Sequence, residues 1–110
     1  MSGSMSDVLQ QLAATISARR SADSGSSYTR QLLDAGPQRC AKKLGEEAVE
    51  VVIAATSESD DALKGEAADL LYHLLVLLES RNVAIADVLA VLANRQGISG
   101  LQEKAGRASS

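Results

Sequence analysis

Residues 67–78 read AADLLYHLLVLL, and this stretch decides the fold. Apolar side chains occupy its whole circumference at helical spacing, with Leu70 and Leu74 on one side and Tyr72 and Val76 roughly opposite. A helix that is apolar all round must be buried all round, and this one is too short to span a bilayer, which needs about 20 apolar residues. Since a small helical monomer leaves one side of each helix exposed to solvent, we expect a second subunit to cover that side. The stretch therefore predicts a homodimer or a larger homo-oligomer.

The composition of the whole chain points to an all-α protein. Its 110 residues fit one domain, and 45% of them are hydrophobic, which is enough to build a core. Ala (18) and Leu (15) dominate the apolar set, whereas Phe and Trp are absent and Pro occurs once. Ala and Leu are strong helix formers, and the aromatic residues that favour strands are nearly missing. A β-sandwich or β-barrel is therefore excluded.

Charge and residue usage exclude several classes of function. The net charge of −3 disfavours a nucleic-acid binder, which needs a basic face, and two Tyr residues make no stacking platform for single strands. A single Cys rules out an internal disulfide and a multi-Cys zinc site. With no long apolar run and no secretory signal pattern, we expect no membrane segment and a cytoplasmic location.

Punctuating residues divide the chain into four main helices and one short one. We expect the short helix to be capped by Ser27 and stopped by Gly36, Pro37 to open the next helix, and Asn82 to end the long apolar one. The expected main helices cover 7–20, 37–56, about 60–81 and 85–96, arranged as an antiparallel bundle completed by dimerisation. Residues 1–4 precede a second start-like Met5 and are interpreted as a cloning remnant, which leaves residues 5–110 as the single domain.

Acidic residues gather on one face of each of two consecutive helices. At about 100° per residue, Glu46, Glu47 and Glu50 fall within one arc of about 100°. On the following helix, Glu66 and Asp69 share a face with His73. The intervening residues suffice to end one helix, turn and begin an antiparallel neighbour, which would bring the two acidic faces together.

A solvated acidic surface is the ordinary interpretation of such a pattern, but two observations argue against it. No basic residue lies between Lys43 and Lys64, so the acids lack the partners that helices usually supply. Glu66 and Asp69 also border the most apolar stretch, where an uncompensated charge is costly. Converging carboxylates without Cys suit Mg²⁺ or Mn²⁺. A di-iron bundle would need Glu-x-x-His on two helices, and the chain has none.

The segments GEEAVE (45–50) and EAAD (66–69) resemble the E-x-x-E…E-x-x-D signature of the all-α, MazG-type nucleoside-triphosphate pyrophosphatases. Four blocks are similar more specifically to the phosphoribosyl-ATP pyrophosphatase family (HisE type): SYT (27–29), CAKKLGEE (40–47), DLLYHLL (69–75) and SGLQEKA (99–105). The resemblance runs from about Val8 to Arg107. It implies hydrolysis of 1-(5-phosphoribosyl)-ATP to phosphoribosyl-AMP and pyrophosphate, the second step of histidine biosynthesis. Many members are fused to the next enzyme, a cyclohydrolase; we expect this short chain to be monofunctional.

The resemblance also implies a role for each candidate residue. Glu47, Glu50, Glu66 and Asp69 would be metal ligands, and Glu46 either a further ligand or the base that orients the attacking water. The residues expected to hold phosphate oxygens, with a plain surface role as the alternative, are Lys43, Lys42, Arg30, Lys104 and Arg107.

Other choices stay open at this point. His73 could be a hydrogen-bonded core histidine or a second layer of support for Asp69 or Glu66. Tyr28 could pack on the substrate's base or ribose, or anchor a loop, and Cys40 is expected to be a small core residue. Rival functions are a MazG-like enzyme acting on another nucleotide such as dUTP, and a non-enzymatic helical module with an acidic stripe.

Overall fold

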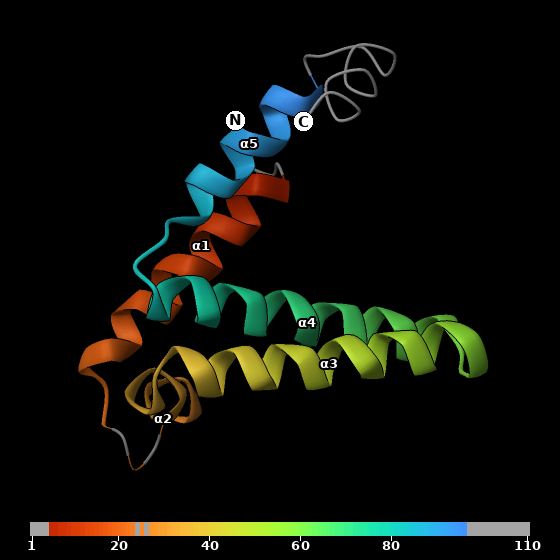
Figure 1. The fold of residues 1–110 in the computed structure, drawn as a ribbon, viewed down its shortest axis with the longest axis horizontal. Helices are drawn as coiled ribbons and strands as arrows, with labels where there is room; N and C mark the ends of the chain where they lie inside the picture. Colours follow the sequence, from red (N-terminus) through yellow and green to blue (C-terminus); the bar gives the residue numbers. More distant parts are fainter. Residues whose placement is uncertain (1–4, 24, 26, 97–110) are drawn as a thin grey trace.

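A computed structural model describes residues 5–23, 25 and 27–96, and every regular element within those ranges is helical (Figure 1). The elements are α1 (Met5–Ala18), the short 3₁₀ turn η1 (Arg19–Ser21), α2 (Tyr28–Ala35), α3 (Pro37–Ser57), α4 (Asp60–Ser80) and α5 (Ile85–Gln96). The predicted all-α class is confirmed. The proposed cloning remnant, residues 1–4, lies outside the described residues.

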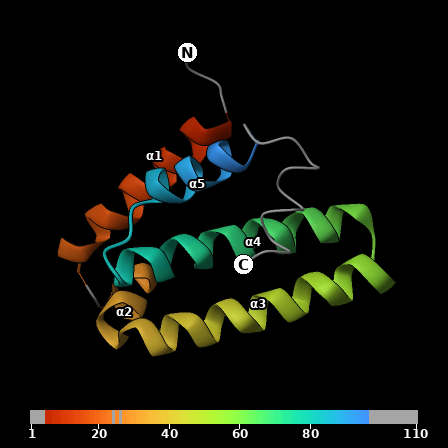
Figure 2. The same ribbon diagram turned by 45° about the horizontal axis from the view of Figure 1, so that its top comes forward.

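The long helices α3 and α4 form an antiparallel hairpin, and the other helices pack around it (Figures 1 and 2). Helix α2 packs beside the beginning of α3 and also contacts α4. Helices α1 and α5 lie side by side, and both rise from the end of the hairpin where α4 finishes. This arrangement leaves the middle of α3 and the facing part of α4 available for a site.

Capping residues set the helix boundaries, among them Ser27, Gly36 and Asn82 as predicted and Ser59 in addition. The Ser27 and Ser59 hydroxyls accept hydrogen bonds from the Arg30 and Ala62 backbone N–H groups, each at 3.1 Å. Gly36 ends α2 with φ = 96°, a conformation that favours glycine, and the next residue opens α3 as a proline at its first turn. The stop predicted at Asn82 is confirmed by its left-handed backbone, with φ = 58°.

The core lies where α1, α2, α3 and α4 meet. Ile16, Leu32 and Cys40 are buried there together with Leu75 and Val76 of α4. The Cys40 thiol donates to the Leu32 carbonyl oxygen at 3.3 Å, and burial raises the pKa of the thiol. Cys40 is therefore the small core residue that the sequence predicts.

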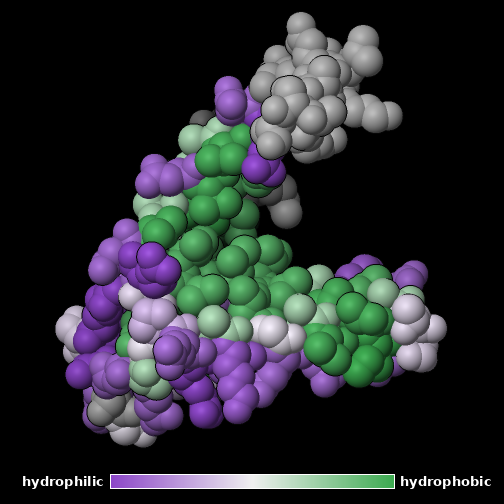
Figure 3. Space-filling view, viewed as in Figure 1, coloured by the Kyte–Doolittle hydropathy of each residue, from purple (hydrophilic) through white to green (hydrophobic). Residues whose placement is uncertain are grey.

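Apolar side chains remain exposed on the single chain. Leu71 in the middle of α4 is 44% exposed, and Val49, Val52 and Ile53 of α3 are exposed as well. Figure 3 shows apolar side chains gathered over α4 and along the flanks of α1 and α5. One chain therefore does not bury α4 all round, which is the condition under which we expect a second subunit. No helix in the described part of the chain is both long and apolar enough to cross a membrane.

Candidate metal and phosphate site

Three carboxylates from two helices converge on one point. Glu47 of α3 faces Glu66 and Asp69 of α4, and one oxygen from each of the three lies within 4.8 Å of the other two. The antiparallel hairpin makes this contact, since Glu66 and Asp69 are one turn apart on the face of α4 that meets α3. The structure thus brings together three of the four residues predicted to bind metal.

Within the described part of the chain, no ion pair neutralises the three carboxylates of this cluster, although the charge of Lys43 also acts on Glu47. The pKa of Glu66 is raised, first because the carboxylate is partly desolvated and then because Glu50, Asp69 and Glu47 repel its charge. Among residues 5–23, 25 and 27–96, the ion pairs involve other acids, namely Glu79, Asp34, Glu46 and Asp61. Three oxygen ligands that lack a cation of their own match the donor set of Mg²⁺ or Mn²⁺.

Glu50 and Glu46, the other two predicted acids, stand at the margin of this cluster. Glu50 is exposed and is not among the three converging residues, but its charge is the largest electrostatic contribution to the raised pKa of Glu66. Glu46 is turned toward Lys43, whose Nζ lies 3.3 Å from Oε1. Glu58, just after α3, repels the charge of Glu66 more weakly, and sequence reasoning did not identify this residue.

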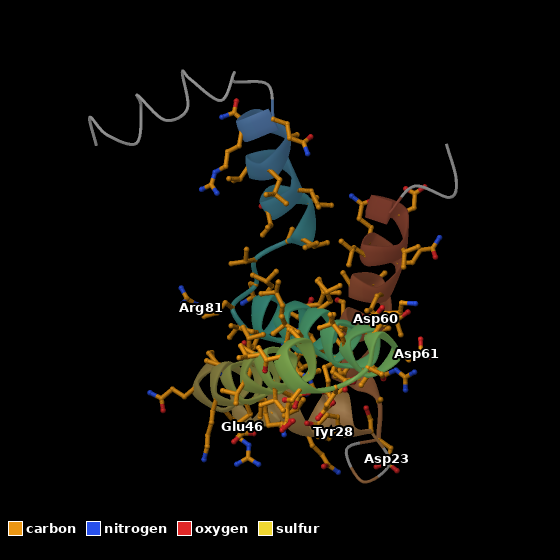
Figure 4. The ribbon with its side chains drawn as sticks, turned by 90° about the vertical axis from the view of Figure 1, so that its right-hand side faces the viewer. Asp23, Tyr28, Glu46, Asp60, Asp61 and Arg81 are labelled. Carbon is orange, nitrogen blue, oxygen red and sulfur yellow. The ribbon has the colours of Figure 1, made fainter. Side chains whose placement is uncertain are left out.

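Lys43 lies about one helical turn before Glu46 and Glu47 on α3 and is half-buried, whereas Lys42 is exposed. The pKa of Lys43 is raised, first by its hydrogen bond to Glu46 and next by the neighbouring Tyr28 hydroxyl. Figure 4 shows Glu46 and Tyr28 on the same side of the α3–α4 pair, away from α5. Lys43 thus interacts electrostatically with both Glu46 and Tyr28.

Of the remaining predicted phosphate ligands, the structure describes Arg30. Arg30 is engaged in local contacts: its Nε donates to both carboxylate oxygens of Asp34 at 3.0 Å, and its NH1 donates to the Ala22 carbonyl at 2.5 Å. These bonds hold the loop before α2, and a role in binding phosphate stays a prediction. Lys104 and Arg107 lie outside the described residues.

His73 is buried and uses both ring nitrogens. Its Nδ1 lies 2.9 Å from the backbone carbonyl oxygen of Asp69, and its Nε2 lies 3.3 Å from the Tyr28 hydroxyl. The ring therefore contacts the main chain of a predicted metal ligand and not its carboxylate. Sequence reasoning did not find the Tyr28 partner, because that contact depends on α2 packing against α4.

A second contact between the same two helices was also missed. The hydroxyls of Thr29 on α2 and Tyr72 on α4 are hydrogen-bonded, and the Tyr72 ring packs edge-on against His73 with centroids 4.9 Å apart. The two contacts together dock the first turn of α2 on α4.

Known proteins match this chain over most of its length. The profile of the phosphoribosyl-ATP pyrophosphohydrolase family matches residues 9–96. The chain belongs to this family. A phosphoribosyl-ATP pyrophosphatase of Jannaschia sp. (strain CCS1) is 58% identical over 99 residues, which are 90% of this chain and 97% of that protein. A phosphoribosyl-ATP pyrophosphatase of Cereibacter sphaeroides (strain KD131) is 55% identical over 100 residues, which are 91% of this chain and 97% of that protein. The protein of the same name in Dinoroseobacter shibae is 57% identical over 100 residues, which are 91% of this chain and 98% of that protein.

Membership of the phosphoribosyl-ATP pyrophosphohydrolase family confirms the resemblance predicted from the four sequence blocks. Three of those blocks, 27–29, 40–47 and 69–75, meet in the structure around the acidic cluster and the Tyr28–His73 contact. The fourth, 99–105, falls outside the described residues.

Proposed function

We propose that this chain hydrolyses 1-(5-phosphoribosyl)-ATP to 1-(5-phosphoribosyl)-AMP and pyrophosphate, the second step of histidine biosynthesis. The observation that carries the proposal is the convergence of Glu47, Glu66 and Asp69, with one oxygen of each within 4.8 Å of the others, in a chain of this family. Such a cluster suits hydrolysis of the anhydride bond between the α- and β-phosphates, which chiefly requires charge neutralisation and positioning. We place this activity in the cytoplasm, as the sequence predicts.

A divalent cation, Mg²⁺ or Mn²⁺, would be held by Glu47, Glu66 and Asp69. Glu50 would be a fourth ligand, since its charge already acts on Glu66. The donor set fits, because it consists of carboxylate oxygens, the ligands that these cations prefer. When bound, the cation would neutralise the substrate's phosphates and polarise the bond that breaks.

Protein side chains supply the remaining steps. Glu46, at the margin of the cluster, would either join the metal ligands or orient water and accept its proton as the water oxygen bonds to the α-phosphorus. The anhydride bond then breaks, and pyrophosphate leaves with the electron pair of the bridging oxygen. Lys43, now paired with Glu46 at 3.3 Å, supplies positive charge to phosphate oxygens on the same face. Lys42, Arg30, Lys104 and Arg107 remain further candidates for this role.

The active form that we propose is a homodimer. Support comes from the exposed apolar residues of α3 and α4, among them Val52, Ile53 and Leu71, which are 60%, 41% and 44% exposed. These positions lie on long helices that a monomer cannot cover on both sides.

Product analysis tests the proposed reaction directly. The protein is incubated with Mg²⁺ and, in separate reactions, phosphoribosyl-ATP, ATP or dUTP, and pyrophosphate and the nucleotide product are quantified. Preferential cleavage of phosphoribosyl-ATP to phosphoribosyl-AMP is expected. Preferential cleavage of dUTP or another (d)NTP would instead establish a MazG-like enzyme of different specificity. Absence of pyrophosphate in all three reactions would contradict catalysis.

A further inference from the structure

Both ring nitrogens of His73 have a defined partner, and this fixes the direction of each hydrogen bond. A backbone carbonyl oxygen only accepts, so Nδ1–H donates to Asp69 at 2.9 Å. In the neutral ring Nε2 then carries the lone pair and accepts from the Tyr28 hydroxyl at 3.3 Å. The proton of the Tyr28 hydroxyl is thereby directed into the protein.

Tyr28 combines this anchored hydroxyl with an open ring. The residue is 48% exposed, although it stands in the first turn of α2 beside the buried Ser27. Its ring meets His73 edge-on, with centroids 6.1 Å apart and an angle of 75° between the planes. An aromatic ring that is anchored at its hydroxyl, in a residue nearly half exposed, can offer a preorganised surface to another flat ring.

The position of Tyr28 relates it to the proposed site. His73 follows Asp69 by one turn of α4, a rise of about 6 Å. Tyr28 also acts electrostatically on Lys43 of α3, whose pKa is raised first by its hydrogen bond to Glu46 and then by Tyr28. Tyr28 thus stands one turn beyond the acidic cluster, on the side marked by Lys43.

We propose that Tyr28 contacts the purine nucleoside part of the substrate, and that His73 is a positioning residue that holds the Tyr28 ring for it. The proposal rests on the proposed function, because it assigns a part of that substrate to Tyr28. Phosphate oxygens need hydrogen-bond donors, and the Tyr28 hydroxyl already donates its hydrogen bond to the neutral His73 ring. A purine offers a stacking face, and its amino group or a ribose hydroxyl offers a donor to Oη.

Calorimetry with two product-like probes separates this role from phosphate binding. AMP carries a purine nucleoside, whereas pyrophosphate carries only phosphate, and each is titrated into the protein in the presence of Mg²⁺. Tyr28→Ala should weaken AMP binding at least roughly fivefold, the lower end for the loss of a base–aromatic stack, and leave pyrophosphate binding unchanged. Equal weakening of both probes, or of neither, would overturn the proposal.

Tyr72→Phe is the matched control. It also removes a hydroxyl that bonds α2 to α4, through Thr29, but from a side chain that we do not place on the substrate. We expect Tyr72→Phe to lower the melting temperature without changing AMP affinity. If it weakens AMP binding as much as Tyr28→Ala does, docking of α2 and not ring contact explains the effect, and the proposal fails.

A double-mutant cycle tests the positioning role of His73. His73→Phe keeps a ring in the buried site but removes the acceptor for Tyr28, and should weaken AMP binding less than Tyr28→Ala does. In the Tyr28→Ala background, His73→Phe should cause no further loss, whereas an additive loss would show that His73 acts independently of Tyr28. Should His73→Phe not fold, Tyr28→Phe breaks the same bond from the exposed side, and unchanged AMP affinity there would overturn the positioning role.

The outcome remains separable from that of the proposed function. A wild-type protein that binds AMP in a Tyr28-dependent manner but releases no pyrophosphate from phosphoribosyl-ATP would contradict the proposed reaction alone. If the wild-type protein cleaves phosphoribosyl-ATP and Tyr28→Ala does so with the same KM, the contact between Tyr28 and the substrate alone is contradicted.

Discussion

Glu47 on α3 and Asp69 on α4 bring carboxylate oxygens to within 4.8 Å of each other, and Glu66 adds a third at the same point. Two like charges at this separation destabilise the folded chain unless a cation or a proton is present. The pKa of Glu66 is raised, first by partial desolvation and then by the charges of Glu50, Asp69 and Glu47. The site is therefore expected to be a source of instability in the metal-free protein.

Glu66→Gln should raise the melting temperature of the metal-free protein near neutral pH by roughly 1–4 °C, while abolishing turnover. The amide has nearly the shape of the carboxyl group but no charge to repel its neighbours. Thermal denaturation with chelator and a pyrophosphate-release assay check the two effects. Asp87→Asn is the control, because it removes an acid from the first turn of α5 and should not stabilise the protein.

The same change has a defined pH dependence. Folding raises the pKa of Glu66 above its ordinary value of 4.5, so the folded state favours the protonated carboxyl. Wild-type stability should fall, relative to Glu66→Gln, as the pH rises from about 4.5 through the raised pKa, and the two proteins should converge at lower pH. A difference that widens toward low pH would contradict the assigned cause.

Lys43→Ala should reduce kcat by roughly 10²–10³-fold, the range for loss of one preorganised group that stabilises developing charge. The lysine shares the face of Glu46 and is the half-buried cation beside the acids. Steady-state kinetics with phosphoribosyl-ATP measure the change. Lys64→Ala provides the comparison, since Lys64 is exposed and paired only weakly with Asp61 at 3.7 Å; similar losses in both variants would reject a specific role for Lys43.

Deleting residues 98–110 should raise KM and leave the melting temperature nearly unchanged, because Lys104 and Arg107 are removed while every described helix is retained. Removing residues 108–110 alone keeps both cations and should have no effect on KM. Unchanged kcat and KM in the longer deletion would show that the phosphate ligands lie elsewhere.

Sedimentation at micromolar concentration should give at least twice the chain mass of 11.5 kDa. Val52→Glu should shift the protein toward monomer, because it places a charge on the exposed apolar face of α3, turned away from Glu47 by about 140°. Gln38→Glu adds the same charge at an exposed polar position and should leave the assembly intact. A wild-type monomer would refute the dimer.

Much of the fold could be predicted because its boundaries depend on local chemistry. Ser27, Gly36 and Asn82 cap or stop helices through backbone preferences that neighbouring residues determine. The acidic cluster was predictable for a related reason: helical periodicity places Glu66 and Asp69 on one face, and a short turn makes the two long helices antiparallel neighbours.

What could not be predicted depends on how side chains meet across helices. Glu46 shares the arc of Glu47, yet it pairs with Lys43 and stays outside the converging group. His73 has no partner identifiable from its own helix except the Asp69 carbonyl; Tyr28 reaches it only because α2 docks on α4. Such contacts depend on how helices pack against one another, and helical periodicity gives only the face on which a residue lies.

Cation binding by the acidic cluster tests the central claim most directly. Mn²⁺ is titrated into wild-type protein and Asp69→Asn, and free Mn²⁺ is followed by electron paramagnetic resonance, with Asp61→Asn as a control for losing an acid from the same helix. We predict that wild type and Asp61→Asn bind Mn²⁺ alike and that Asp69→Asn binds at least roughly tenfold more weakly, as expected when a ligand is removed from the metal. Equal affinity in all three proteins would contradict the assignment of this cluster as the metal site.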